Sequence, residues 1–99
     1  MYARMHTLEL TAEQYDRGLR LIIDDLLPWM RDSGGFRGLL GLVDRERGKA
    51  VVLSFWADED SLGESADAGE RLSALAAAAS GGTRRSLEEF EVSIFELKP

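Results

Sequence analysis

The sequence predicts an α+β fold with the element order β-α-β-β-α-β, in which four antiparallel strands form one sheet and both helices cover the same face. Three observations lead to this prediction. Two apolar runs flank a short polar turn, as in a β-hairpin. One stretch with helical periodicity precedes this hairpin, and a second follows it. Strand-like segments stand near both ends of the chain.

The N-terminal third predicts a strand followed by an amphipathic helix. Residues 2–9 alternate imperfectly in polarity and are rich in strand-forming side chains. Thr11 and Gln14 have the spacing of a capping box, in which each side chain accepts a hydrogen bond from the other residue's backbone N–H. Apolar residues then recur at every third or fourth position, so we expect a helix over roughly 12–32. Pro28 predicts a kink or a loosened last turn there, because proline lacks an N–H and crowds the preceding turn.

The central hairpin is the most strongly marked part of the chain. Residues 36–43 and 50–57 are both predominantly apolar and predict two strands, joined by the polar turn 44–49. Both strands carry large apolar side chains at odd and at even positions. Such strands are typical of a sheet that is covered on both faces.

A second helix and a last strand complete the prediction. Asp58 is the expected N-cap of this helix, and the acidic Glu59 and Asp60 favour its positive end. Glycines in the first half of the helix predict a break, and Gly81–Gly82 predicts its end. Alternating apolar residues predict the last strand over about 87–97. The resulting order is the split β-α-β, ferredoxin-like arrangement.

Length and composition restrict the classes of protein. The 99 residues predict a single domain over 1–99. A net charge of −6 argues against a nucleic-acid partner, and the absence of cysteine excludes disulfides and thiolate metal sites. No apolar run reaches the roughly 18 residues that span a membrane. The N-terminus lacks the apolar core of a signal peptide, so we expect a cytoplasmic protein with neither a membrane nor a nucleic acid as partner.

Alternation along the hairpin predicts that the face without helices is apolar as well. In the first hairpin strand, Phe36, Leu40 and Leu42 are expected on one side, and Leu39 and Val43 on the other. The second hairpin strand sets Val51, Leu53 and Phe55 against Val52, Ser54 and Trp56. Monomers rarely expose an apolar patch of several hundred Å². We therefore expect a homodimer in which two sheets pack face to face, with coverage by loops or helix ends as the alternative.

Two local motifs, together with the element order, make the chain similar to a known group. Gly-Phe-Arg-Gly stands at 35–38, after a helix that ends in Pro-Trp-Met at 28–30, and Trp-Ala-Asp-Glu-Asp-Ser stands at 56–61. Over almost its whole length the chain resembles the antibiotic biosynthesis monooxygenase branch of the dimeric α/β-barrel superfamily. This resemblance implies a dimer that binds or oxidises a small aromatic, quinone-forming or polyketide-like ligand between sheet and helices, without any cofactor or metal.

The resemblance also suggests site residues. Trp56 matches the strand-end tryptophan that lines the pocket of such enzymes and is a candidate catalytic residue, but the asparagine that accompanies it there has no counterpart, because this chain contains no asparagine. His6 is the other catalytic candidate, as the only side chain whose ordinary pKa lies near neutrality. The candidate ligand-binding residues are Arg37, which could hold an acidic or phenolate group, Asp25 at the pocket border, and Phe55 beside the tryptophan.

Each candidate also has a purely structural interpretation. Trp56 could be a packed core aromatic, His6 a half-buried strand residue, and Arg37 a member of an ion pair. A non-catalytic dimeric barrel with a ligand-binding or structural role is therefore the alternative function. Haem binding comes third, because residues 58–80 lack the histidine that binds iron in the haem-degrading members, and only His6 could replace it. An open cleft beside Trp56 would favour a ligand site.

Overall fold

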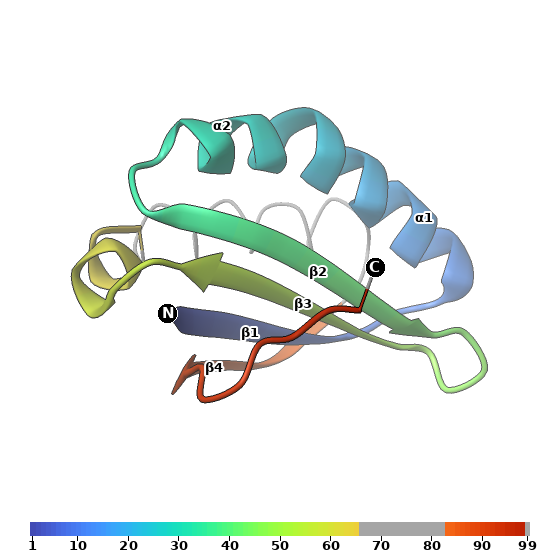
Figure 1. Ribbon diagram of the computed structural model, residues 1–99. Coiled ribbons are helices and arrows are strands. Elements are labelled where there is room, and N and C mark those ends of the chain that lie inside the picture. Colours follow the sequence, from blue (N-terminus) through green and yellow to red (C-terminus); the bar gives the residue numbers. More distant parts are fainter. Residues whose placement is uncertain (66–82, 99) are drawn as a thin grey trace.

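The computed structural model describes residues 1–65 and 83–98, with the backbone alone for 83–86. Its elements in chain order are β1 (Tyr2–Glu9), α1 (Ala12–Leu21), a π-helical turn η1 (Ile22–Leu26), α2 (Leu27–Asp32), β2 (Phe36–Asp44), β3 (Lys49–Trp56) and β4 (Thr83–Glu91). Residues 59–65 are helical as well. The helical stretch from α1 to α2 lies across one face of the sheet (Figure 1).

The sheet has the order β2-β3-β1-β4, and its three strand pairs are all antiparallel. The predicted α+β class and the four-stranded antiparallel sheet are thus confirmed. The start of the second helix is confirmed too, since the Asp58 carboxylate accepts from the backbone N–H of Ser61 at 2.8 Å. The predicted break in this helix and its predicted end at Gly81–Gly82 lie outside the described residues.

The first helix begins with the predicted capping box. The Thr11 hydroxyl oxygen accepts from the N–H of Gln14 at 3.1 Å, and the Gln14 side-chain oxygen accepts from the N–H of Thr11 at 2.8 Å. The predicted distortion near Pro28 is present, but it takes the form of the π turn that precedes the proline. The N–H of Leu27 bonds to the carbonyl of Ile22, five residues back. Because Pro28 cannot donate a hydrogen bond, a widened turn accommodates it without interrupting the helix.

A β-bulge in β2 corrects the predicted orientation of Phe36. Phe36 pairs with Trp56, whereas Gly38 pairs with Phe55, so Arg37 is the extra residue. One extra residue reverses the alternation, and Phe36 therefore lies on the helix side of the sheet, not beside Leu40 as strict alternation predicted. Its ring packs edge-on against Trp56, with the ring centroids 5.6 Å apart.

The last strand covers Thr83–Glu91, so the predicted range 87–97 was wrong at both ends. Its pairing with β1 ends where β1 begins, at the Tyr2–Glu91 pair, and the N–H of Val92 then bonds to the carbonyl of Met1. The alternating apolar pattern continues beyond this point. Residues 92–98 nevertheless form no strand, because alternation produces a strand only where a neighbouring strand is available for pairing.

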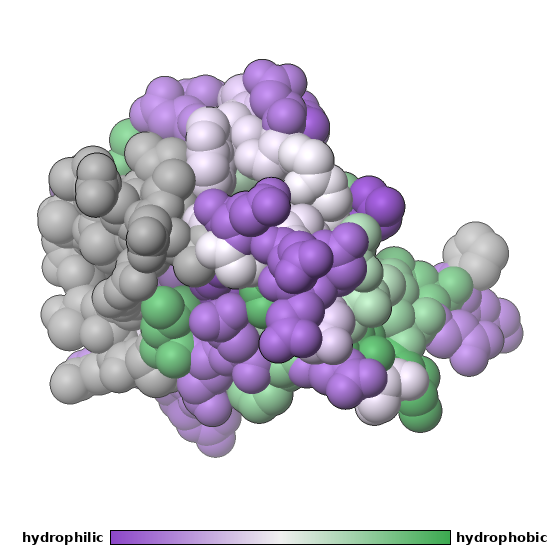
Figure 2. Space-filling model, turned by 90° about the vertical axis from the view of Figure 1, so that its left-hand side faces the viewer, coloured by the Kyte–Doolittle hydropathy of each residue, from purple (hydrophilic) through white to green (hydrophobic). Residues whose placement is uncertain are grey.

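The two faces of the sheet have different coverings. Under the helices, Leu26, Met30 and Leu62 pack against Trp56 and form the described core. On the opposite face, Phe95 packs edge-on against Phe55, with the ring centroids 5.1 Å apart. The exposed large apolar residues of this face and of the C-terminal segment are Leu40, Leu42, Phe90, Ile94, Phe95 and Leu97. Apolar surface gathers on the right-hand side of Figure 2, toward the C-terminal end.

Candidate functional site

A group of polar side chains is buried on the helix side of the sheet. Arg4, His6 and Ser54 come from β1 and β3, at positions whose side chains point toward the helices, as does that of Trp56. Arg4 is 2% exposed and Trp56 is fully buried. Burying polar groups costs free energy unless they are hydrogen-bonded, so such a group in a small core marks a candidate site. We call these four residues the inner site.

The indole of Trp56 is held from several directions. Its Nε1–H donates to the Ser54 hydroxyl at 3.0 Å, while Phe36 packs on the ring from β2. The two sequence motifs meet beside it, since the N–H of Ala57 donates to the carbonyl of Gly35 at 2.7 Å. A side chain at Gly35, whose φ is +84°, would also meet Ser61. The motifs therefore serve first to fix the end of β3 and the helix that follows it.

Arg4 connects the sheet to that helix. One of its terminal nitrogens, Nη2, donates to the carbonyl oxygen of Leu62 at 2.7 Å, and the other, Nη1, donates to the Ser65 hydroxyl at 3.3 Å. A guanidinium keeps its charge at any ordinary pH, so a permanent cation lies within the inner site. Arg4 was not among the residues that the sequence suggested, although it shares the parity of His6 along β1.

The cavity at the inner site is small in this structure. It measures about 10 Å³, which is the space of a single water molecule. Its floor is polar and comes from Arg4, His6, Ser54 and Trp56. Its roof is apolar and consists of Leu26, Trp29 and Met30, from η1 and α2. The cavity is lined by a tryptophan and several polar groups, but it is not the open cleft beside Trp56 that would favour a ligand site.

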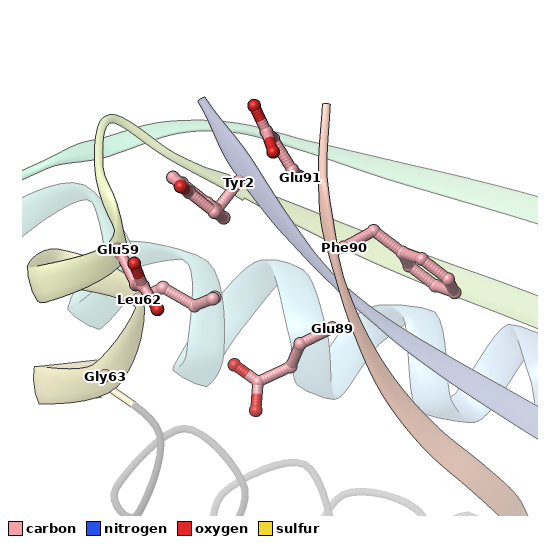
Figure 3. Close-up of a pocket in the computed structure, with 7 residues that line it drawn as sticks. All are labelled: Tyr2, Glu59, Leu62, Gly63, Glu89, Phe90 and Glu91. Atoms are coloured by element: carbon pink, nitrogen blue, oxygen red, sulfur yellow. The ribbon is translucent and has the colours of Figure 1, made fainter. Parts of the chain in front are cut away.

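A larger hollow of about 320 Å³ lies at the edge of the sheet, between residues 59–65 and the strands β1 and β4. Figure 3 shows Glu59, Glu89 and Tyr2 around it, with the ring of Phe90 turned to the opposite side of β4. Leu62 lines this hollow and also belongs to the core cluster that contains Trp56. The carboxylates around the hollow make its rim negative.

The remaining sequence candidates lie away from the inner cavity. Arg37 is exposed at the bulge and donates to the carbonyl of Phe36 at 3.2 Å. Asp25 is exposed in η1, and Phe55 is buried on the opposite face of the sheet from Trp56. His6 and Trp56 are the two candidates that line the same cavity.

The carboxyl group of Asp58 has a clearly shifted pKa. The backbone N–H of Ser61 lowers the pKa of this carboxyl below its usual value, and the Ser61 side chain and the charge of Arg37 act in the same direction. The group is exposed and caps a helix, so its shift reflects local structure at the end of β3.

Neither a metal cluster nor a membrane helix is found in the described part of the chain. Residues 1–65 and 83–98 contain no group of three or more histidine, cysteine, aspartate or glutamate side chains arranged to hold a metal ion. Within the same ranges, none of the helices combines the length and the hydropathy that crossing a membrane requires.

Comparison with other sequences gives distant relatives. No protein-family model matches the chain. The uncharacterised proteins Rv2557 and Rv2558 of Mycobacterium tuberculosis are 28% and 27% identical to it, over 94% and 95% of its length. These alignments cover 41% and 39% of the two proteins. The chain thus spans about two fifths of the length of the curated relatives it matches.

Solved structures share the fold over nearly the whole chain. A provisionally assigned antibiotic biosynthesis monooxygenase of Deinococcus radiodurans matches with a TM-score of 0.71 and 17% identity, over 100% of this chain and 99% of that one. A variant of SnoaB, a cofactor-independent oxygenase of Streptomyces nogalater, matches with a TM-score of 0.70 and 11% identity, over 95% and 94%. The ActVA-Orf6 monooxygenase of Streptomyces coelicolor, in complex with nanaomycin D, matches with 0.61 and 15%, over 97% and 92%.

These matches define the class of the fold. The chain has the fold of the antibiotic biosynthesis monooxygenase branch of the dimeric α/β-barrel proteins, as the sequence motifs predicted. Sequence identities of this size establish the fold alone.

Proposed function

We propose that this protein binds a small, flat aromatic ligand at the inner site and oxidises it with molecular oxygen, without a metal or an organic cofactor. The observation that carries the proposal is the burial of Arg4, His6 and Ser54 around Trp56 beneath an apolar roof. Aromatic and apolar walls with a few convergent polar groups are typical of small-molecule sites. The oxygenases that share the fold make this chemistry the natural one to test.

The reaction class is the oxidation of a phenol to a quinone. His6 would take the phenolic proton, and the phenolate carbon para to the oxygen would then form a bond to O2. The peroxide so formed takes up a proton. Loss of the para C–H proton and cleavage of the O–O bond leave a second carbonyl and release water. One phenol and one O2 thus give one quinone and one water, the ring being oxidised and O2 reduced.

Ligand entry requires the roof of the site to move. A cavity of about 10 Å³ holds no aromatic ring, so Leu26, Trp29 and Met30 must shift outward on binding. The π turn η1 supplies the roof residue Leu26 and directly precedes the other two. π turns interrupt regular α-helical bonding and are frequent at functional sites.

The proposal extends to a homodimer formed through the face opposite the helices. Three large apolar side chains are exposed on that face, those of Leu40, Leu42 and Phe90. Packing two such faces together would remove this apolar surface from water. The cytoplasmic location and the single-domain organisation expected from the sequence stay predictions.

The alternative function is a dimeric barrel that binds a ligand without oxidising it. One observation favours this alternative: the indole N–H of Trp56 already donates to Ser54 and is therefore not directed at a ligand. Under this alternative, the aromatic ligand would still enter the inner site but would leave unchanged.

Two measurements on one set of proteins test the proposal. Binding of 1-naphthol and anthrone is followed by equilibrium dialysis, and turnover by oxygen uptake together with detection of the quinone product. We expect binding, and oxygen consumption equal to the quinone formed, with turnover strongly reduced in His6→Gln and binding weakened in Trp56→Phe. Binding without oxygen uptake would favour the alternative, and failure of both compounds to bind would refute the inner site.

A further inference from the structure

The hydrogen-bonding group of Trp56 is already used within the protein. Its Nε1–H donates to the Ser54 hydroxyl at 3.0 Å, and both residues line the inner cavity. Trp56 is fully buried and Ser54 is 4% exposed, so this bond forms away from water. An indole has a single N–H and no other donor. The part of Trp56 that is left for a ligand is therefore its aromatic ring.

The strand β3 holds the serine and the tryptophan in this arrangement. Residues two positions apart along a strand project from the same face of the sheet, which brings the Ser54 hydroxyl beside the indole. In the pairing with β2, Trp56 lies opposite Phe36, whose ring packs edge-on against the indole with the centroids 5.6 Å apart. A rotation of the indole toward a ligand would break both the hydrogen bond and this ring contact.

We infer that Ser54 determines the ligand specificity of the inner site. It keeps the indole N–H from bonding to a ligand, so that Trp56 contacts aromatic ligands through its ring and gives no hydrogen bond to a carbonyl oxygen. This inference rests on the proposed function of the inner site. A buried carbonyl without a donor loses its hydrogen bonds to water at a cost in free energy. The ligand class is therefore an aromatic ring system whose edge toward Trp56 carries no carbonyl group.

Removal of the serine hydroxyl should reverse this specificity. Ser54→Ala leaves the indole N–H without its acceptor, and a ligand carbonyl can then take the place of the hydroxyl oxygen. A net hydrogen bond of ordinary strength corresponds to an affinity gain of about two- to tenfold. A ligand of the same shape without a carbonyl has no such gain, so the ratio of the two affinities reports on the indole N–H.

The test compares 9-fluorenone with fluorene, which share one ring skeleton and differ by a carbonyl in place of a methylene group. Equilibrium dialysis gives the affinity of each probe for the wild type and the variants. In Ser54→Ala we expect the ratio of fluorenone to fluorene affinity to rise about two- to tenfold above the wild-type ratio. Ser54→Thr keeps a hydroxyl acceptor and should have the wild-type ratio. The double variant with Ser54→Ala and Trp56→Phe lacks the donor and should have it too.

Three results would overturn the role of Ser54 while leaving the proposed site intact. The first is an unchanged ratio in Ser54→Ala. The second is a threonine variant that behaves like the alanine variant. The third is an increase that persists in the double variant, because the increase would then come from the space that the hydroxyl leaves and not from the indole N–H.

Trp56→Phe alone keeps the test decisive if Ser54→Ala does not fold. We expect this variant to bind both probes more weakly without selecting against the ketone, because the wild-type N–H does not serve the ligand. A selective loss of fluorenone binding would show that it does, and would overturn the inference. If neither probe binds to the wild type, the proposed function of the inner site is refuted instead.

Discussion

The indole N–H of Trp56 donates a hydrogen bond of 3.0 Å to the hydroxyl oxygen of Ser54, two residues earlier on the same face of β3. Both residues are buried, so this bond forms away from water. It supplies the indole N–H with an acceptor, so a ligand that used this N–H would have to compete with the serine.

Ser54→Ala is expected to lower the free energy of unfolding by about 1–3 kcal/mol, because it leaves the buried indole N–H without its acceptor. Urea unfolding followed by tryptophan fluorescence measures the change. The matched control is Ser93→Ala, at an exposed position, which should change stability by less than about 0.5 kcal/mol. Equal effects of the two variants would contradict an energetic role for the bond.

Gly35→Ala should destabilise the protein by at least about 2 kcal/mol. The φ of +84° is strained for alanine, and the added methyl group would meet the Ser61 side chain. Gly34→Ala is the control, since open space surrounds that position. Thermal unfolding of both variants checks the prediction. A Gly35→Ala protein as stable as Gly34→Ala would mean that the two motifs do not lock together as described.

Thr11→Ala should lower the free energy of unfolding by about 1 kcal/mol, because it removes the hydroxyl oxygen that caps the first helix. Thr11→Ser keeps that oxygen and should stay close to the wild type. Denaturant unfolding of the pair makes the comparison. A serine variant as unstable as the alanine variant would assign the effect to the lost methyl group and not to the cap.

The charge of Asp58 should stabilise the protein in a pH-dependent way. The Ser61 backbone N–H holds the pKa of this carboxyl below the ordinary value of 3.8, so the ionised form favours the folded state. Its contribution is therefore complete above pH 3.8 and is lost as the pH falls through the lower, folded-state pKa. Asn caps helices as well as Asp does, so Asp58→Asn changes the charge and keeps the cap.

Thermal unfolding of wild type and Asp58→Asn across pH 2–7 measures this dependence. We expect the wild type to have the higher melting temperature near neutral pH, and the difference to vanish at the acidic end. A difference that is constant over the whole range would contradict the assigned pKa direction.

Leu42→Asp should convert the proposed dimer into a monomer, because it places a charge in the apolar face opposite the helices. The control is Ile23→Asp on the helix, since Ile23 is 52% exposed and Leu42 is 49% exposed. Sedimentation equilibrium at micromolar concentration gives the masses. A wild-type monomer, or a dimer that survives Leu42→Asp, would refute packing through this face.

Much of the fold could be predicted from local patterns. The first strand, the capping box and both hairpin strands lie within about one residue of their expected positions, because periodicity and caps are local in sequence. The bulge at Arg37 and the true range of β4 could not be predicted in this way. Both depend on pairing with a neighbouring strand, which alternation in a single segment does not reveal.

The lining of the inner cavity was predictable in part. Trp56 and His6 were singled out, and they line one cavity. Arg4 was missed because charged side chains are usually exposed, so its inward parity was given no weight. The sequence does indicate the side of the sheet on which Arg4 lies, because Arg4 shares the parity of His6 along the strand. Its burial becomes visible only in the structure, where residues 59–65 pack above it.

Because of the bulge at Arg37, the number of residues between α2 and the paired part of β2 decides which face of the sheet Phe36 occupies. If Arg37 were deleted and the hairpin pairing kept, the ring of Phe36 would turn from Trp56 to the far surface, and Gly35 would lose its position beside Ser61. Substitutions at Arg37 keep Phe36 on the helix side of the sheet, whereas an insertion or a deletion there does not. Homologous sequences should therefore vary freely in the identity of this residue while the residue count between Gly35 and Gly38 stays constant.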